Sequence, residues 1–148
     1  MHSVHAFEFT VIAKLINYGQ PIKGRRIRFA LVGCGRIAQN HLSAVNRHLE
    51  RAEPVAVCDV DPEACAGAAE ASGAQPFDSL SALLAQSEAD IVVLSTPSGL
   101  HAEQAIQIAR WGRHVMTEKP MATRWEDGKR MVQACDNANV RLFVVKQN

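Results

Sequence analysis

The sequence has few aromatic residues and almost no net charge. It holds five Phe, two Trp and one Tyr in 148 residues, and sixteen Lys and Arg stand against fifteen Asp and Glu. Without basic side chains interleaved with aromatic ones, binding to nucleic acid is not expected. The apolar residues are mainly Ala, Val, Leu and Ile, which suits a parallel sheet covered by helices better than a β-sandwich.

Long apolar runs and metal-binding patterns are also missing. No apolar run reaches the roughly eighteen residues that a membrane span requires, so no membrane association is expected. The cysteines have no C-x-x-C spacing and no histidine at a metal-ligand spacing; they are Cys34, Cys58, Cys65 and Cys135. We therefore predict reduced thiols in or near the core of a cytoplasmic protein, and no metal site. The Cys34 thiol lies in a glycine turn and could respond to oxidants, although the turn needs only a small residue there.

Residues 1–26 differ from the rest of the chain. Apolar side chains recur there at helical spacing, at Val4, Phe7, Val11 and Leu15, and Gly19-Gln20-Pro21 then ends the pattern. Glu8 and Lys14 would interrupt the apolar core of a secretory signal. We interpret residues 1–26 as a loosely attached extension, either a short helix or an artefact of an upstream start site, with a partner-binding helix as the alternative.

Short apolar runs alternate with helical patterns throughout residues 27–148. The predicted strands are 29–32, 54–58, 75–77, 91–95, 114–117 and 141–145, and the predicted helices are 37–45, 63–72, 80–85, 102–111 and 123–138. Their short connections imply right-handed crossovers and parallel strands. We predict one α/β domain over residues 27–148, a doubly wound parallel six-stranded sheet in the Rossmann order 3-2-1-4-5-6.

Several predicted helices begin with residues that favour a helix N-terminus. Pro62 fits the first turn of one helix, and Ser79 and Thr123 are predicted N-caps of two others. The last helix is expected to run to about Ala138 and to bury one side, made up of Trp125, Met131, Val132 and Cys135.

A glycine turn joins the first strand to the first helix in a G-x-G-x-x-A pattern. Gly33 permits the tight turn, and Gly35 lets a pyrophosphate approach the backbone. The free N–H groups at the helix start, which includes Arg36 and Ile37, then face an anion. Glycine turns join many strands to helices, so the weight of this motif depends on its context.

Polar residues directly follow the other strands of the predicted sheet, where ligands bind in such folds. A carboxylate at Asp59 can accept hydrogen bonds from a ribose diol and repel a 2′-phosphate, which favours NAD over NADP. The alternative is a helix N-cap, a role that Asp61 could fill instead. Thr96 and Pro97 follow the fourth strand in the same way.

The fifth strand leads into Glu118 and Lys119. Lys119 precedes Pro120 and could carry a proton beside a nicotinamide, or be an ordinary surface lysine. Glu118 could bind a ribose hydroxyl or pair with a neighbouring lysine. His101 lies within reach of a nicotinamide ribose but could equally be structural, and ordinary helix or strand positions are expected for His41, His48 and His114.

Four motifs in this order resemble the Gfo/Idh/MocA oxidoreductases. They are Gly-Cys-Gly-Arg-Ile-Ala at 33–38, Cys-Asp-Val-Asp-Pro at 58–62, Thr-Pro-Ser-Gly-Leu-His at 96–101 and Glu-Lys-Pro at 118–120. The resemblance covers residues 26–148 and implies that Lys119 is catalytic beside the nicotinamide. It also implies a bond before Pro120 that is often cis, and cofactor contacts by Thr96, Pro97 and His101.

The resemblance also implies a substrate and a second domain. Val-Val-Lys-Gln-Asn at 144–148 is similar to members that oxidise the 3-hydroxyl of a UDP-N-acetylated sugar acid in polysaccharide biosynthesis. Family members continue into an α/β domain that holds the substrate and mediates homo-oligomers, and this chain lacks it. We therefore expect the NAD-binding half of a sugar or nucleotide-sugar dehydrogenase, inactive alone. The alternative is a non-catalytic nucleotide-binding module that needs a partner or the missing domain.

Overall fold

The computed structural model describes residues 21–146 of the chain. The helix predicted near residues 4–15 lies outside the described residues. The strands are β1 (Ile27–Val32), β2 (Ala52–Cys58), β3 (Gln75–Phe77), β4 (Ile91–Leu94), β5 (His114–Thr117) and β6 (Leu142–Val144). The helices are α2 (Arg36–Asn46), α3 (Pro62–Ser72), α4 (Leu80–Gln86), α5 (His101–Arg110) and α6 (Trp125–Asn137), with a short 3₁₀ helix η1 (Ser98–Leu100) before α5.

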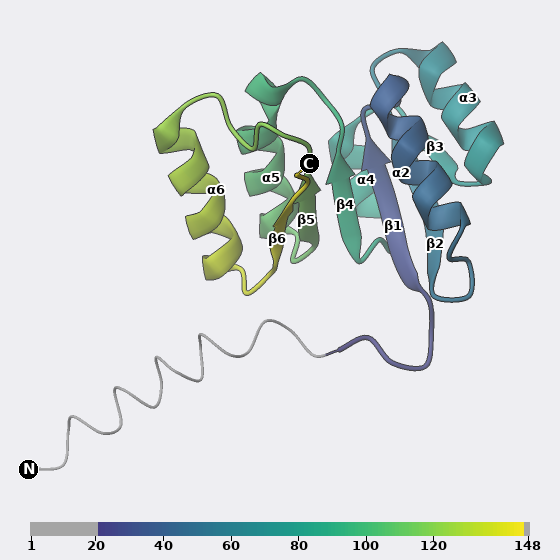
Figure 1. The fold of residues 1–148 in the computed structure, drawn as a ribbon, viewed down its shortest axis with the longest axis horizontal. Coiled ribbons are helices and arrows are strands. Elements are labelled where there is room, and N and C mark those ends of the chain that lie inside the picture. Colours follow the sequence, from purple (N-terminus) through teal and green to yellow (C-terminus); the bar gives the residue numbers. More distant parts are fainter. Residues whose placement is uncertain (1–20, 147–148) are drawn as a thin grey trace, which may run out of the picture.

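The strands form one parallel sheet in the order β3-β2-β1-β4-β5-β6. Helices α2 and α3 pack on one face, over β1 and β2, and α4, α5 and α6 pack on the other face (Figure 1). Right-handed crossovers account for this division, because the chain moves outward in one direction from β1 to β3 and in the opposite direction from β4 to β6. The predicted doubly wound Rossmann order is confirmed.

The central strands are buried on both faces, which explains why their sequences show little polar alternation. Within β1, Leu31 packs with α2 and α3, whereas Ala30 and Val32 pack with the helices of the other face. Strand β2 begins two residues earlier than predicted, and its pairing with β1 shifts register after Phe29, which lies opposite Pro54. Pro54 has no N–H to donate to a ladder, so an irregularity at this point is expected.

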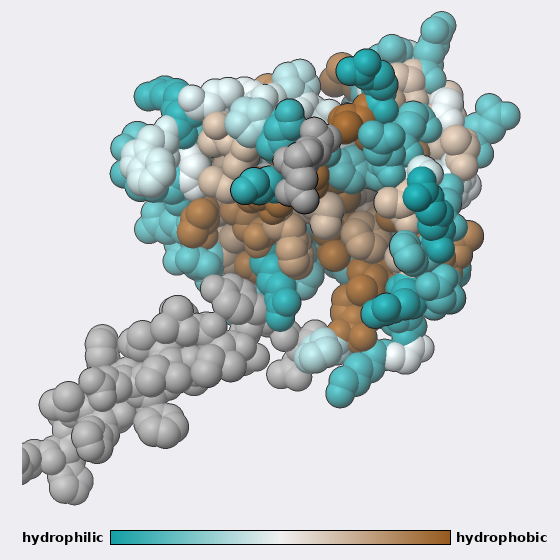
Figure 2. Space-filling model, in the orientation of Figure 1, coloured by the Kyte–Doolittle hydropathy of each residue, from teal (hydrophilic) through white to brown (hydrophobic). Residues whose placement is uncertain are grey.

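One half of the sheet carries no helix on the α2 and α3 side among the described residues. Met116 and Phe143 are register partners on that side, and Phe143 remains 36% exposed. Figure 2 shows hydrophobic side chains gathered over β5 and β6 in this region. We call the surface formed by Ile91, Met116 and Phe143 the open sheet face.

The predicted inner side of α6 is wrong at two positions. Trp125 is 79% exposed and Val132 is 45% exposed, while Met131 and Cys135 are buried as predicted. Successive helical residues turn by about 100°, which places Trp125 and Val132 roughly 70 to 90° to one side of the buried stripe. Thr123 does not cap this helix either, because its N-cap is Arg124 and no described side chain caps it.

The other predicted helix starts agree with the structure. Ser79 caps α4 by accepting a hydrogen bond from the N–H of Ala82, and Pro62 lies in the first turn of α3. None of the described helices is both long and apolar enough to cross a membrane.

Asp90 connects the segment before β1 to the sheet. The two guanidinium nitrogens of Arg25 donate to its carboxylate at 2.7 and 2.8 Å, and the backbone N–H of Arg28 donates at 2.8 Å. Burial alone would raise the pKa of Asp90, but the hydrogen bonds and charges of Arg25 and Arg28 outweigh it and lower the pKa. The charged carboxylate therefore stabilises the fold.

We predict that Asp90→Ala lowers the free energy of unfolding by about 2 kcal/mol near neutral pH, because charge-assisted hydrogen bonds are lost. The folded-state pKa of Asp90 lies below its unfolded value, so this contribution is present above about pH 4 and is lost as the pH falls through the folded-state pKa. Urea unfolding at neutral and acidic pH measures both effects. The exposed Glu88 is the control, and Glu88→Ala should change little. A loss of stability equal at both pH values would contradict the prediction.

Candidate functional site: the strand ends beside the glycine turn

The carboxyl ends of β1, β2, β4 and β5 meet at one edge of the sheet. Backbone hydrogen bonds continue the ladders past the strands: Gly33 N–H donates to Cys58 at 2.8 Å, and Glu118 N–H donates to Leu94 at 3.1 Å. Between them, Ser95 N–H donates to Val32 at 2.8 Å. The turn glycines, Asp59, Thr96 and Lys119 all follow these strand ends within three residues, so the structure brings the predicted site residues to one edge.

The two glycines of the turn are required for different reasons. Gly33 has φ +89°, and a Cβ there would lie 2.7 Å from the carbonyl carbon of Ser95 and 2.8 Å from Thr96 N. Only glycine fits so close to the backbone of the next strand. At Gly35 a Cβ would meet no described atom within 4 Å, so the space above Gly35 is open to a ligand.

The start of α2 offers unpaired N–H groups beside that open space. Its N-cap is Gly35, no described side chain caps it, and its first turn holds no acidic residue. Arg36 is exposed, Ile37 is half-buried and Ala38 is fully buried against the sheet. A helix start with these properties favours an anion, and the pyrophosphate contact stays a prediction.

Asp59 is bonded to the glycine turn. One carboxylate oxygen accepts the N–H of Cys34 at 2.6 Å and the other accepts the N–H of Asp61 at 2.9 Å. Asp61 in turn caps α3 by accepting the N–H of Glu63 at 3.0 Å. The helix N-cap is therefore Asp61 and not Asp59. The half-buried Asp59 carboxylate is held beside the start of α2.

His101 is buried between the ends of β4 and β5, with 1% of its surface exposed. Its Nε2 lies 2.8 Å from the Thr96 carbonyl oxygen, and its Nδ1 lies 3.1 Å from the Pro120 carbonyl oxygen and 3.0 Å from the Thr117 hydroxyl. Both ring nitrogens are thus engaged by the protein. This geometry fits the structural alternative, and the cofactor contact of His101 stays a prediction.

The Glu118-Lys119-Pro120 segment follows β5, and the peptide bond before Pro120 is cis. The Lys119 side chain is exposed and forms no ion pair with the described part of the chain. Glu118 is only 8% exposed, and its carboxylate lies 2.7 Å from Nε2 of His41. No pattern in the sequence indicates this last contact, because His41 has an ordinary helical position 77 residues away.

The Thr96 and Pro97 segment lines the edge between β4 and η1. The Thr96 hydroxyl donates to Oε1 of Gln104 at 2.5 Å, so its side chain is directed toward α5, while Pro97 is exposed. Among the described residues, no group of three or more His, Cys, Asp or Glu could hold a metal ion.

All four cysteines lie within the described residues and are buried and free. Burial raises the pKa of Cys34 to about 12 and the pKa values of Cys58 and Cys135 to about 11. The Cys34 thiol donates to the Cys58 carbonyl oxygen at 3.5 Å. These thiols are therefore packing groups, and the geometry does not favour a response of Cys34 to oxidants.

We predict that a thiol-reactive disulfide reagent modifies none of the cysteines of the folded chain at mildly alkaline pH, because all four thiols are buried away from the reagent. All four thiols should react once urea unfolds the protein. Counting the released chromophore before and after unfolding measures this, and rapid modification of Cys34 in the folded chain would contradict it.

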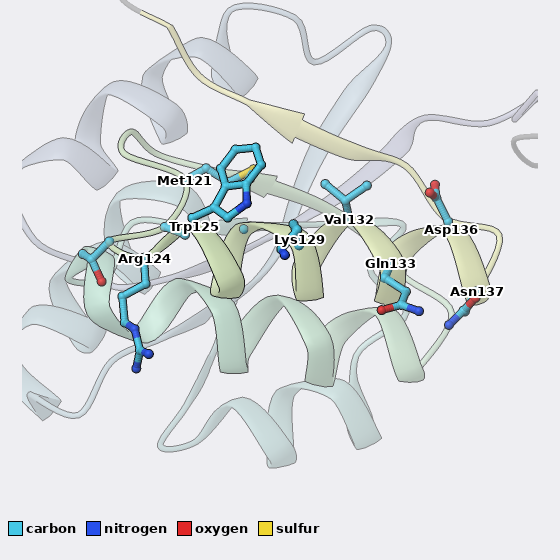
Figure 3. A pocket seen from close by; sticks show the side chains of 11 residues that line it. Met121, Arg124, Trp125, Lys129, Val132, Gln133, Asp136 and Asn137 are labelled. Atoms are coloured by element: carbon cyan, nitrogen blue, oxygen red, sulfur yellow. The ribbon is translucent and has the colours of Figure 1, made fainter.

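A large groove runs along α6, beginning at Met121, two residues beyond Lys119. It has a volume of about 770 Å³ and is lined in part by Trp125, Lys129 and Val132. Figure 3 shows Met121 and Trp125 at one end of the groove and Asn137 at the other. It shares no residue with the glycine turn, so we do not assign it to the same site.

Comparison with known proteins finds a matching family and similar solved structures. The model of an oxidoreductase family with an NAD-binding Rossmann fold matches residues 27–146. The WlbA dehydrogenase from Bordetella pertussis, solved with NADH and UDP-GlcNAcA, is 66% identical with a TM-score of 0.85 over 86% of this chain and 38% of that chain. WlbA from Chromobacterium violaceum, solved with the same two molecules, is 60% identical with a TM-score of 0.86 over 88% of this chain and 38% of that chain.

A curated relative extends the comparison to other substrates. The D-apiose dehydrogenase of Paraburkholderia graminis is 35% identical over 121 residues, which is 81% of this chain and 32% of that protein. The chain spans about a third of the length of the curated relatives it matches. With the family match over nearly all described residues and the Rossmann topology in place, the chain belongs to the Gfo/Idh/MocA oxidoreductases and comprises their NAD-binding Rossmann domain.

Proposed function

We propose that this chain is the NAD-binding half of a dehydrogenase that acts on a secondary alcohol of a nucleotide-sugar. The observation that carries the proposal is the convergence of the glycine turn, Asp59 and Lys119 at one sheet edge. The two WlbA structures, which hold NADH and UDP-GlcNAcA, support this substrate class. Oxidation of the 3-hydroxyl of a UDP-N-acetylated hexuronic acid, in polysaccharide biosynthesis, remains our prediction.

The residues at this edge fit a dinucleotide. Gly35 leaves open space at the start of α2, where the backbone N–H groups of Arg36 and Ile37 would bind a pyrophosphate. The Asp59 carboxylate, bonded to the turn at 2.6 Å, would accept hydrogen bonds from the adenosine ribose diol and repel a 2′-phosphate. This favours NAD over NADP.

The other half of the site, around Lys119, would hold the nicotinamide and the substrate hydroxyl. NAD, when bound, supplies the hydride acceptor. The exposed Nζ of Lys119 would take the proton of the substrate hydroxyl, which makes Lys119 the proposed catalytic residue. The proposed cofactor contacts on this side are Thr96, Pro97, His101 and Glu118.

Enclosing the sugar would require polypeptide beyond these residues, because the chain spans 38% of the WlbA chains. We therefore propose that the chain binds NADH but turns over no substrate alone, and that the full-length form is a homo-oligomer. A cytoplasmic location remains a prediction.

Fluorescence titration with NADH tests the proposal. We expect saturable binding, and at least about tenfold weaker binding of NADPH, because the Asp59 carboxylate would repel the added phosphate. In the same preparation, NAD and UDP-GlcNAcA should give no detectable NADH. No saturable signal at millimolar NADH would contradict cofactor binding.

A second candidate is a non-catalytic nucleotide-binding module completed by a polypeptide that carries the substrate domain. The open sheet face favours it, since Phe143 is 36% exposed. Robust turnover of any alcohol by the chain alone would exclude this candidate. NADH binding without turnover that is restored by an added substrate domain would support it.

A further inference from the structure

We propose that His41 is a positioning residue of the cofactor site, which fixes the Glu118 carboxylate and, through it, the backbone of Lys119. This inference rests on the proposed function, because it concerns the half of the site that would hold the nicotinamide. It assigns a role to a histidine whose sequence position predicts none.

The geometry of the pair carries the inference. Nε2 of His41 lies 2.7 Å from Oε1 of Glu118, and the two side chains are only 16% and 10% exposed. Oε2 of Glu118 accepts the backbone N–H of Lys119 at 3.3 Å. Both carboxylate oxygens therefore have protein donors, as a buried carboxylate requires, and Glu118 cannot turn toward solvent without losing them.

The contact between His41 and Glu118 connects α2 to the segment that carries Lys119. His41 lies on α2, the helix whose start faces the proposed pyrophosphate site, and its neighbour Leu42 is buried against the sheet. Ala38, one turn earlier, is also fully buried. The pair thus links a firmly packed helix at the pyrophosphate end to the segment that presents Lys119 at the nicotinamide end.

His101 holds the opposite end of the same segment. Its ring lies within hydrogen-bond distance of the Pro120 and Thr96 carbonyl oxygens, at 3.1 and 2.8 Å. The backbone on either side of Lys119 is thus held by one buried histidine from α5 and one largely buried histidine from α2, while the Lys119 side chain is exposed. Such support fixes the backbone from which the Lys119 amine would reach the substrate hydroxyl and accept its proton.

Two ligands separate this role from a purely structural one. NADH and ADP-ribose share the adenosine, the pyrophosphate and the second ribose, but only NADH carries the nicotinamide ring that would lie beside Lys119. A residue that positions this segment should affect NADH alone, whereas a residue needed only for folding should affect both ligands equally.

The experiment measures the Kd values of both ligands by calorimetry for the wild-type chain, His41→Leu and His41→Gln. We expect His41→Leu to weaken NADH binding about tenfold and to change ADP-ribose binding by less than about twofold, because one hydrogen bond to a charged group is lost. His41→Gln keeps a nitrogen donor near the Nε2 position and should restore most of the NADH affinity. His48→Leu is the matched control, since the His48 side chain is 69% exposed, and should bind both ligands as the wild type does.

Four results would overturn the inference. Unchanged NADH affinity in folded His41→Leu would do so, as would an equal loss for both ligands in His41→Gln. NMR of the imidazole nitrogens of the wild-type chain shows which nitrogen of His41 carries a proton, and it requires no variant. A His41 ring without a proton on Nε2 could not donate to Glu118 and would also overturn the inference. If the wild-type chain binds ADP-ribose and NADH with equal affinity, the inference fails while nucleotide binding stands; if it binds neither, the proposed function itself fails.

Discussion

Gly33→Ala is expected to lower the free energy of unfolding by about 2 to 5 kcal/mol. Alanine at φ +89° is strained by about 1 to 2 kcal/mol. In addition, its Cβ would lie 2.7 Å from the carbonyl carbon of Ser95, and forcing an atom into a packed interior costs about 1 to 3 kcal/mol more. The atoms in the way belong to the backbone at the end of β4, so no side-chain rotation relieves the overlap. Urea unfolding followed by circular dichroism measures the loss.

Gly35→Ala is the matched control in the same turn. A Cβ at Gly35 meets no described atom within 4 Å, and φ is −70°, so we expect a change in stability within about 1 kcal/mol. NADH binding, in contrast, should weaken in Gly35→Ala, because the methyl group would occupy the space that a pyrophosphate needs. Equal destabilisation by the two substitutions, or unchanged NADH affinity in Gly35→Ala, would contradict the different roles assigned to the two glycines.

Asp59→Ala is expected to weaken NADH binding by about tenfold or more, since the acceptor for the ribose diol is removed. It should also cost about 1 to 3 kcal/mol of stability, because the N–H groups of Cys34 and Asp61 lose the carboxylate that accepts them. The discrimination against NADPH should diminish with the loss of the negative charge. Parallel titrations with NADH and NADPH, together with urea unfolding, separate the two effects.

Asp61→Ala provides the control for Asp59. Asp61 caps α3, so its removal should cost about 1 kcal/mol of stability and leave NADH affinity unchanged. If the two aspartates proved interchangeable in NADH binding, the cofactor role of Asp59 would be wrong.

The sequence predicted most of the fold because the local signals agreed with one another. The apolar stretch at 91–94 has almost no polar residue, as a strand buried on both faces requires, and Gly73 and Pro62 bound α3 at its two ends. With six such strands in alternation with helices, the handedness of the crossovers leaves few topologies open. The parallel order followed from this rule and from the position of the glycine turn.

The inner side of α6 could not be predicted because the sequence does not show where a neighbouring element ends. Trp125 and Val132 are apolar and close to the buried stripe, but the sheet beneath α6 is narrow and ends at β6. They therefore line a groove on the outside of the described chain. Apolar periodicity alone cannot separate a residue that packs within the domain from one left at its surface.

The candidate site was predictable in its position but not in its internal contacts. Residues that directly follow strands of a parallel sheet meet at one edge, which placed Gly35, Asp59 and Lys119 from the sequence alone. The contact between His41 and Glu118 joins positions 77 residues apart and depends on how α2 packs on the sheet. The bond from Cys34 N–H to Asp59 likewise depends on the depth of the glycine turn, which no local pattern encodes.

Amide chemical shifts of the isotope-labelled chain, followed during titration with NAD, test most directly whether the cofactor lies across the ends of β1, β2, β4 and β5. We predict saturable shift changes at Gly35 and Arg36, at Val60 beside Asp59, and at Lys119, with the surroundings of Trp125 in the α6 groove unchanged. Changes confined to the α6 groove or to the open sheet face, or no change at millimolar NAD, would contradict the proposed site.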